Sequence, residues 1–268
     1  MAVIVSAGIC GPVHAQGHCP DPVVALIGEH FGIDNLAFPE IPGEERKPGD
    51  VVAATCSAWP ENTQQTLAVF AYHDPKLVDE QRVPLIVALV DDRKRRVLAE
   101  FRGSILEEVT SVLEPDSFSI GTARYELAPG IHAFSVDAST RSLARCVDGG
   151  EGDNRRLFVR EGAVIRLVLD NFYLSTWHVK KGTLPGCGEG TETGKEDEAE
   201  IETAWYSIGT GSVGAHGFVD LAIDARSSVV GKEPLRYVLQ YDGRRYPGSA
   251  LSTINGGGEA LSKWRGAR

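Results

Sequence analysis

Short runs of apolar and β-branched residues, separated by polar or glycine-containing breaks, make up most of the chain from residue 66 onward. Residues 66–73 (TLAVFAYH) and 84–91 (PLIVALVD) are the clearest, and residues 97–101 follow across the charged turn 92–95. Runs of this length and composition, bounded by turn residues, predict β-strands. Further strands are predicted for residues 117–127, 131–138, 155–160, 163–170, 172–180, 199–208, 217–225 and 235–241.

Many of these predicted strands are joined by short links, of which residues 128–130 (APG) and 161–162 (EG) are suited to tight turns. Helical periodicity is almost absent from this part of the chain. Consecutive strands with short links predict an all-β protein with antiparallel, meander-rich sheets. A sandwich, a barrel and a propeller-like stack all remain compatible with the pattern.

One short helix is expected near the N-terminus, over residues 21–32 (DPVVALIGEHFG). Asp21 is a natural N-cap, Pro22 suits the first turn, and Gly32 is a typical stop. Residues 33–50 are rich in proline, glycine and charge from residue 38 onward, and they are predicted to form a loop.

Composition narrows the class of protein. The chain has 268 residues, is 42% hydrophobic and 24% charged, and carries a formal net charge of −10. These are globular values, so a collagen-like or low-complexity chain is excluded. The acidic balance argues against a nucleic-acid partner, and no run approaches the roughly 20 apolar residues of a membrane span. We expect a single β-rich domain over residues 16–246, followed by a disordered tail over residues 247–268.

The first fifteen residues resemble a signal peptide, because an apolar run (AVIVSAGIC) is followed by a break and then by Val13-His14-Ala15. Small residues at these positions suit cleavage after Ala15. A cationic segment before the apolar run is missing. Either translation starts upstream of Met1, or the segment is a buried N-terminal strand.

Cysteine usage favours an oxidising compartment. Cleavage after Ala15 removes one of the five cysteines and leaves Cys19, Cys56, Cys146 and Cys187, an even set without a CxxC pair. Such a set suits two disulfides and a periplasmic or secreted protein, whereas its spacing does not suit zinc. Of the three possible connectivities, nearest-neighbour pairing, Cys19–Cys56 and Cys146–Cys187, is the one that we expect. Four reduced thiols in a cytosolic protein are the alternative.

An acidic stretch lies between two predicted strands. Residues 186–202 contain seven acidic residues and one lysine, and a mobile loop is expected there. Glu196, Asp197, Glu198 and Glu200 are candidates for docking a basic protein partner. A plain solvated loop is the alternative. The EF-hand calcium pattern is absent, and no metal site or cofactor is assigned.

Aromatic residues concentrate in or beside the last four predicted strands. The default interpretation is a sheet core. The sharper alternative is a ligand groove lined by Trp177 and Trp205, which would bind a glycan or a small ligand.

Signals for catalysis are weak, and no residue is assigned a catalytic role. Residues 209–214 read GTGSVG, but a strand rather than a helix is predicted to follow, so a flexible hairpin loop is expected instead of a dinucleotide site. A hydrolase acting on the cell envelope remains the enzymatic alternative. It would pair Asp170 or Asp220 with His178 or His216, and these residues would have to line one pocket.

Two stretches carry a resemblance to a known group. The first runs from Thr122-Ala123-Arg124-Tyr125 to Ala133-Phe134, and the second comprises residues 217–221 (GFVDL) and 237–246 (YVLQYDGRRY). Together with Cys19 and Cys56, they resemble uncharacterised exported β-rich proteins of proteobacteria. The second stretch is also similar to periplasmic β-rich modules that end in "RYDGxRY", although Gln240 stands where that pattern has arginine. The resemblance implies an exported β-scaffold and no particular activity. We therefore expect a non-enzymatic exported protein that binds another macromolecule, such as an inhibitor or a toxin-immunity protein.

Overall fold

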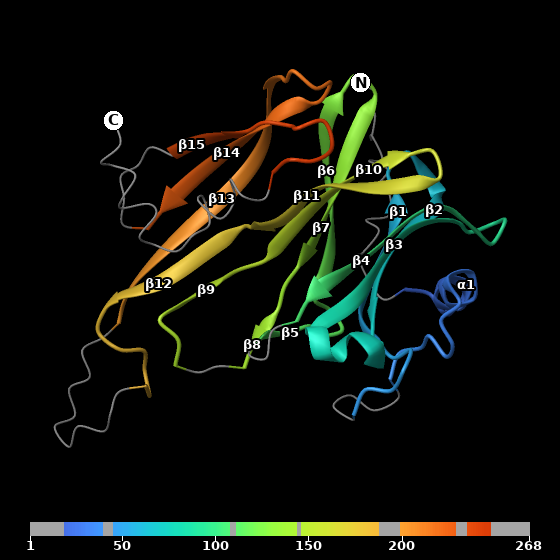
Figure 1. Cartoon of the computed structure of the whole chain (residues 1–268), viewed down its shortest axis with the longest axis horizontal. Helices are drawn as coiled ribbons and strands as arrows, with labels where there is room; N and C mark the ends of the chain where they lie inside the picture. The colour runs from blue at the N-terminus through green and yellow to red at the C-terminus, as the bar shows by residue number, and fades with distance from the viewer. Residues whose placement is uncertain are drawn as a thin grey trace, which may run out of the picture.

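The computed structural model describes residues 19–39, 45–107, 111–143, 146–187, 199–228 and 235–247. It contains one α-helix, and the all-β class is confirmed (Figure 1). The helices and long strands are α1 (Asp21–Phe31), β1 (Val51–Trp59), β2 (Asn62–Tyr72), the 3-10 helix η1 (Pro75–Glu80), β3 (Arg82–Asp91), β4 (Arg96–Leu106), β6 (Phe118–Ala128), β7 (Ile131–Ala138), β10 (Asn154–Glu161), β11 (Val164–Tyr173), β12 (Ser175–Lys181), β13 (Glu200–Val213), β14 (Val219–Ser227) and β15 (Leu235–Leu239). The short strands are β5 (Ser111–Val112), β8 (Arg141–Ser142) and β9 (Gly149–Glu151).

The larger sheet has eight strands in the order β1-β2-β3-β4-β11-β10-β7-β6. It curls so that its edge strands approach each other, and the Ala54 amide donates to the Pro115 carbonyl just before β6. This curl is closest to the barrel among the architectures that the sequence left open. The expectation of purely antiparallel pairing is wrong within the larger sheet, because β4 and β11 pair in parallel at Glu100 and Val164.

The curl encloses a core to which all eight strands contribute. Phe134 and Phe158 stack at its centre with ring centroids 5.6 Å apart, and Trp59 packs edge-on against Phe134. We call this enclosed side the concave face. Because β7 and β10 are paired antiparallel neighbours, their directly opposed residues share a face, and the concave side chains of the two strands can be read from the register.

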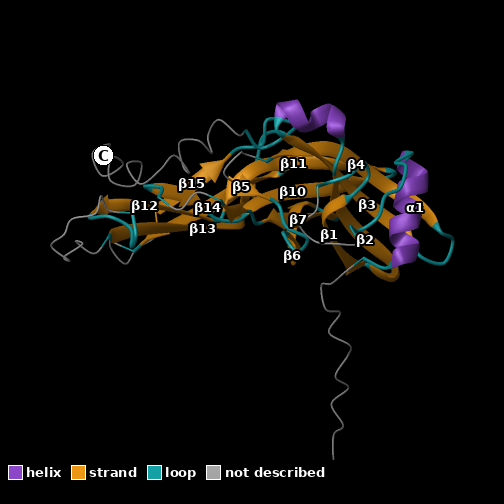
Figure 2. Ribbon diagram, turned by 90° about the horizontal axis from the view of Figure 1, so that it is seen from below, coloured by secondary structure: helices purple, strands orange, loops and turns teal. Residues whose placement is uncertain are grey.

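Helix α1 covers the opposite, convex face, against β1, β2 and β3 (Figure 2). Its first-turn amides are capped by the Pro20 carbonyl, and Asp21 makes no capping bond as it lies one position inside the helix. The expectation that Asp21 is the N-cap is therefore wrong. Gly32 ends the helix at φ 66°, the left-handed conformation that glycine adopts at little cost.

The smaller sheet has five strands in the order β15-β14-β13-β12-β9, and it extends from one side of the larger sheet (Figure 1). One face of it packs against the outer side of β10 and β11. Phe172 of β11 contacts Tyr206 of β13 edge-on, and Leu157 joins the same apolar cluster. The two sheets therefore share a buried interface.

Both expected disulfides are present, Cys19–Cys56 and Cys146–Cys187. The first attaches Cys19, two residues before α1, to β1, and the second joins two loops that flank the smaller sheet. They fit an oxidising compartment. The predicted signal peptide (1–15) and nearly all of the predicted tail (247–268) lie outside the described residues.

No helix in the described part of the chain is long and apolar enough to cross a membrane.

Candidate functional site

The smaller sheet has an outer face that turns away from the larger sheet. Its members follow from the register, because directly paired residues and every second residue along a strand share a face. Trp177 is paired with Thr203, and Trp205 is paired with Ser175 on one side and Arg226 on the other. The outer face comprises Ser175, Trp177, Val179, Ile201, Thr203, Trp205, Ser207, Ala222, Asp224, Arg226, Arg236 and Val238.

The two tryptophans of the predicted groove lie together on this face as diagonal neighbours of β12 and β13. Residues in that relation are about 7–8 Å apart, which is within reach of large aromatic side chains. Trp205 is 50% exposed and Ile201 is 42% exposed, while Trp177 is partly buried. The default expectation that both indoles lie in a sheet core is therefore wrong for Trp205.

Trp177 lies over a glycine. Gly150 of β9 is paired with Trp177, and a Cβ atom at Gly150 would stand 3.0 Å from the indole Nε1. A side chain at this position would push the ring away. The glycine therefore lets the indole lie flat across the edge strand, and it holds the aromatic part of the outer face close to the backbone.

Charged side chains border the tryptophans toward β15. Arg236 donates from Nε to Asp224 Oδ1 at 2.7 Å, and this hydrogen bond and the arginine's charge lower the pKa of Asp224. Arg226 is exposed and lies directly beside Trp205 across the strand pair. The outer face thus combines an apolar aromatic centre with a polar margin, a composition found at macromolecular binding surfaces.

The inner face of the same strands carries a buried polar group. Glu202 is only 3% exposed, although it belongs to the stretch that was expected to be a mobile acidic loop. It accepts a hydrogen bond from Ser227 Oγ at 2.5 Å, and His178 Nε2 lies 3.7 Å from its other oxygen. These two partners explain how a carboxylate is accommodated inside the sheet.

Tyrosines complete this inner face. The Tyr206 hydroxyl lies 3.1 Å from Thr176 Oγ1, and burial raises the pKa of Tyr206. Burial, with a smaller contribution from Tyr206, raises the pKa of Tyr237 to about 12. The inner face is therefore a packed, hydrogen-bonded layer, and it fixes the strands that carry the tryptophans.

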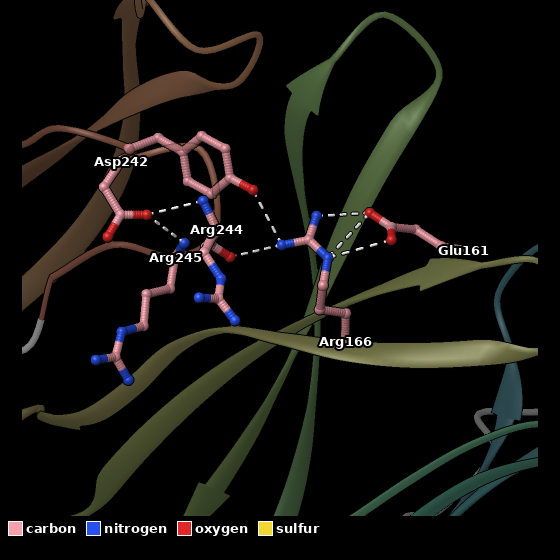
Figure 3. A network of polar contacts seen from close by, with 6 residues as sticks. Glu161, Arg166, Asp242, Arg244 and Arg245 are labelled. Carbon is pink, nitrogen blue, oxygen red and sulfur yellow. Dashed lines mark hydrogen bonds and ion pairs between the residues drawn. The ribbon is translucent and has the colours of Figure 1, made fainter.

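A network of polar contacts anchors the sheet's far end (Figure 3). Arg166 of β11 donates to Glu161, to the Tyr241 hydroxyl at 2.9 Å and to the Arg244 carbonyl at 2.6 Å. Asp242 accepts from the amides of Arg244 and Arg245 at 2.8 and 2.7 Å, and so closes the turn of the YDGRRY stretch. This stretch is a structural anchor.

Of the four acidic candidates for partner binding, only Glu200 lies within the described residues. Glu196, Asp197 and Glu198 lie outside the described residues. Glu200 begins β13, is exposed, and lies 3.9 Å from Lys180 Nζ. Glu200 is therefore the one acidic candidate that the structure places, next to Ile201 at the start of β13.

The four residues of the hydrolase hypothesis are not brought together. Asp170 lies on β11 and forms an ion pair with Arg156. His178 lies on β12 and faces Glu202 of β13. Asp220 lies beside Gly211 of β13. Gly211 is nine residues from Glu202, or roughly 30 Å along the strand, so Asp220 is far from the Glu202 end of β13. His216 is exposed in the turn after β13. The four side chains therefore do not form a single cluster. Asp220 and His216 belong to the same hairpin, where the Asp220 carboxylate lies beside Gly214, but they form no hydrogen bond or ion pair with each other in the described part of the chain.

The GTGSVG stretch is not a hairpin loop as expected. It continues β13 as far as Val213, and the turn follows at residues 214–218. Glycine suits this part of the strand because the strand passes close to its partner: a Cβ atom at Gly211 would stand 3.0 Å from the Asp220 carbonyl oxygen. No group of three or more metal-ligating side chains occurs in the part of the chain that the structure describes.

Comparisons with family models, with curated proteins and with solved structures give no match.

Proposed function

We propose that this protein is an exported, non-enzymatic binding protein that uses the outer face of its smaller sheet to hold another macromolecule. The observation that carries the proposal is the half-exposed Trp205 beside Trp177 on two central, hydrogen-bonded strands. Tryptophan supplies a large contact area at a low cost in side-chain entropy, and it is enriched at the centres of binding interfaces.

The rigidity of the strands supports the same function. Trp205 lies between β12 and β14, because its position on β13 is paired with Ser175 of β12 on one side and with Arg226 of β14 on the other. The inner face beneath it is packed. A binding residue supported in this way needs little ordering when the partner arrives, so more of the contact energy appears as affinity.

The partner is proposed to be a protein with an apolar centre and a basic margin. The apolar centre would cover Trp205, Trp177 and Ile201, and the basic margin would meet the acidic residues Glu196, Asp197, Glu198 and Glu200 where β12 leads into β13. Opposite charges at the margin of an interface mainly speed association and select the partner. An inhibitor or a toxin-immunity protein would work in this way.

Export is the context that the chemistry favours. Two disulfides fit an oxidising compartment. Together with the signal-like first fifteen residues, they support a proposed interaction in the periplasm or outside the cell. The partner would then be another exported protein.

The proposal is tested by affinity capture from a periplasmic extract with the mature chain as bait. We expect a stoichiometric protein partner that binds wild type and is lost with Trp205→Ser. Val213→Ser is the matched control, because Val213 is 83% exposed near the end of the same strand. The control variant should retain the partner.

Charge reversal separates the roles of the two features. Replacing Glu196, Asp197 and Glu198 together by lysine should slow association and leave dissociation nearly unchanged, which surface plasmon resonance resolves. A partner that binds Trp205→Ser as tightly as wild type would overturn the proposed surface. Failure to recover any stoichiometric protein would count against the proposed class of partner.

A glycan is the second candidate ligand, and the exposure of the Trp205 indole is the observation that favours it. The apolar face of a sugar ring stacks on such an indole. Titration with soluble envelope oligosaccharides should then quench tryptophan fluorescence in wild type and have a weaker effect in Trp205→Ser. Quenching without recovery of a protein would favour the glycan.

A further inference from the structure

Two consecutive arginines on β10 differ sharply in how their guanidinium groups are used. Arg155 engages all three of its nitrogens: Nε and Nη2 donate to Asp137 at 2.7 and 2.6 Å, and Nη1 donates to the Tyr125 hydroxyl at 3.0 Å. Its side chain is 20% exposed. Arg155 is thus a satisfied structural residue.

Arg156 is more deeply buried and much less satisfied. Its side chain is 8% exposed, and its one hydrogen bond to a described residue runs from Nε to Asp170 Oδ1 at 2.8 Å. Nη1 and Nη2, which carry four N–H groups, make no hydrogen bond within the described part of the chain. A buried guanidinium with most of its donors unused is costly unless something else accepts them.

The position of Arg156 in the sheet makes its unused N–H donors more unusual. It is paired with Val136 of β7, and Val136 belongs to the apolar core of the concave face. Consecutive residues alternate between faces, so Arg156 points into the concave face and Arg155 points out of it. Arg156 therefore brings a positive charge to the same side of the sheet as Phe158.

A second buried polar atom lies on the same strand face. Asn154, two residues before Arg156, is 9% exposed. It gives its amide N–H to Asn171 Oδ1 at 2.5 Å, while its own Oδ1 is cut off from solvent without a donor. By contrast, Nη1 and Nη2 of Arg156 are not among the atoms cut off from solvent. The end of the concave face near the start of β10 is thus polar, and solvent reaches the arginine.

β11 is not paired with β4 at the position of Asp170. β4 and β11 pair only at Glu100 and Val164, and beyond that bridge the two strands separate (Figure 1). Asp170 lies on the separated part of β11, and its side chain is 50% exposed. Asp170 therefore accepts the hydrogen bond from Nε of Arg156, while part of its own side chain faces solvent.

We propose that Nη1 and Nη2 of Arg156 bind an oxyanion, a carboxylate or a phosphate group, at the polar end of the concave face. The planar pair of terminal nitrogens matches two oxygens of such a group, and a charge-assisted pair of this kind is among the strongest hydrogen-bond arrangements in proteins. Asp170 orients the guanidinium and moderates the affinity, because its own negative charge lies close to the incoming anion. The site is separate from the tryptophans of the outer face.

The test measures how added anions shift the thermal unfolding midpoint of the oxidised mature chain. A ligand that binds only the folded protein raises this midpoint in a concentration-dependent way. Sodium phosphate and sodium acetate are the two probes, and sodium chloride at equal ionic strength is the reference. We expect at least one oxyanion to raise the midpoint beyond the effect of chloride, and the comparison identifies the preferred group.

Two variants then locate the effect. Asp170→Asn removes the competing negative charge at a half-exposed position, and it should tighten oxyanion binding roughly tenfold. Arg156→Gln should abolish binding, whereas Arg160→Gln, an exposed arginine on the same strand, should leave it unchanged. If Arg156→Gln does not fold, the Asp170→Asn result decides alone. Equal shifts in phosphate, acetate and chloride for both wild type and Asp170→Asn would overturn the proposal.

Discussion

Arg166 on β11 and Tyr241, which follows β15, join the two sheets: Nη1 of the arginine donates to the tyrosine hydroxyl at 2.9 Å (Figure 3). The same nitrogen donates to the Arg244 carbonyl, and the other nitrogens hold Glu161. The guanidinium also lies 5.6 Å from the centre of the Phe218 ring. One side chain thus connects the larger sheet, the turn of the YDGRRY stretch and the strand β14 region.

Replacing this arginine should loosen the smaller sheet. Arg166→Gln removes the contacts to Tyr241, Arg244 and Glu161 together, and we expect a loss of about 1–3 kcal/mol in the free energy of unfolding. Urea denaturation measures it. Arg160→Gln is the control, because Arg160 is exposed and bonds only the Gly162 carbonyl among described residues. An equal loss in both variants would show that the Arg166 network contributes nothing specific.

The Cys19–Cys56 disulfide should hold α1 on the convex face. Its closed loop spans 37 residues, so replacing both cysteines by serine is expected to cost about 3–4 kcal/mol, mainly through the entropy of the unfolded chain. Hydrogen exchange should then show lost protection first in Asp21–Phe31. Uniform loss of protection across the larger sheet as well would mean that the bridge stabilises the whole fold instead of the helix contact.

The stability of the contact between α1 and the larger sheet should also depend on pH, through the pair of His30 on α1 with Glu100 on β4. Burial raises the pKa of this carboxyl, but the hydrogen bond and charge of His30, with those of Arg102, outweigh burial and lower it overall. A lowered pKa in the folded state means that the stabilisation is present above about pH 4.5, the ordinary value for the unfolded chain, and is lost as the pH falls through the folded value.

Glu100→Gln should therefore reduce stability at pH 6–7 by up to about 1 kcal/mol, because the pair is partly exposed to solvent. It should also flatten the acid limb of the stability curve, which denaturation at several pH values measures. Asp116→Asn, at an exposed position, is the control. If the wild-type and Glu100→Gln curves stay parallel between pH 3 and pH 6, the His30–Glu100 pair has no part in acid unfolding.

β1 is a strand that its own sequence pattern does not mark. Its residues (VVAATCSAW) lie between the core of the concave face and α1, so both sides of the strand are buried and no polar alternation marks it. The long strands from β2 onward were predictable because apolar runs and tight turns mark their bounds, whereas the short strands β5, β8 and β9 were not predicted. The parallel pairing of β4 with β11 was not, as it joins residues 64 positions apart through one bridge, Glu100 with Val164.

The candidate site was predictable as a pair of residues but not as a surface. In β13 the usual pattern is reversed: the charged Glu202 is buried, and the aromatic Trp205 is exposed. Hydrophobicity alone therefore assigns Glu202 to a solvated loop and Trp205 to a core. The reversal depends on Ser227 and His178, which accommodate the carboxylate from other strands. No local signal reports such partners.

Gly150 offers the most direct test of how the outer face is organised. A methyl group at this position would stand 3.0 Å from Trp177 Nε1 and 3.4 Å from Cε2, which is too close for the ring to stay in place. Gly150→Ala should therefore lift the indole from β9 and raise its accessibility to acrylamide. Fluorescence quenching in a background that carries both Trp205→Phe and Trp264→Phe measures this, since of the four tryptophans only Trp59 then remains beside Trp177. Trp59 is buried and should be only weakly quenched.

Gly209→Ala is the matched control, because a Cβ atom there meets nothing closer than the Ala222 carbonyl at 3.9 Å. In the presence of a partner, Gly150→Ala should weaken binding by disturbing Trp177 while leaving Trp205 intact, and the loss should be smaller than that of Trp205→Ser. Unchanged quenching with unchanged affinity would show that Trp177 does not depend on Gly150. The aromatic centre would then be Trp205 alone.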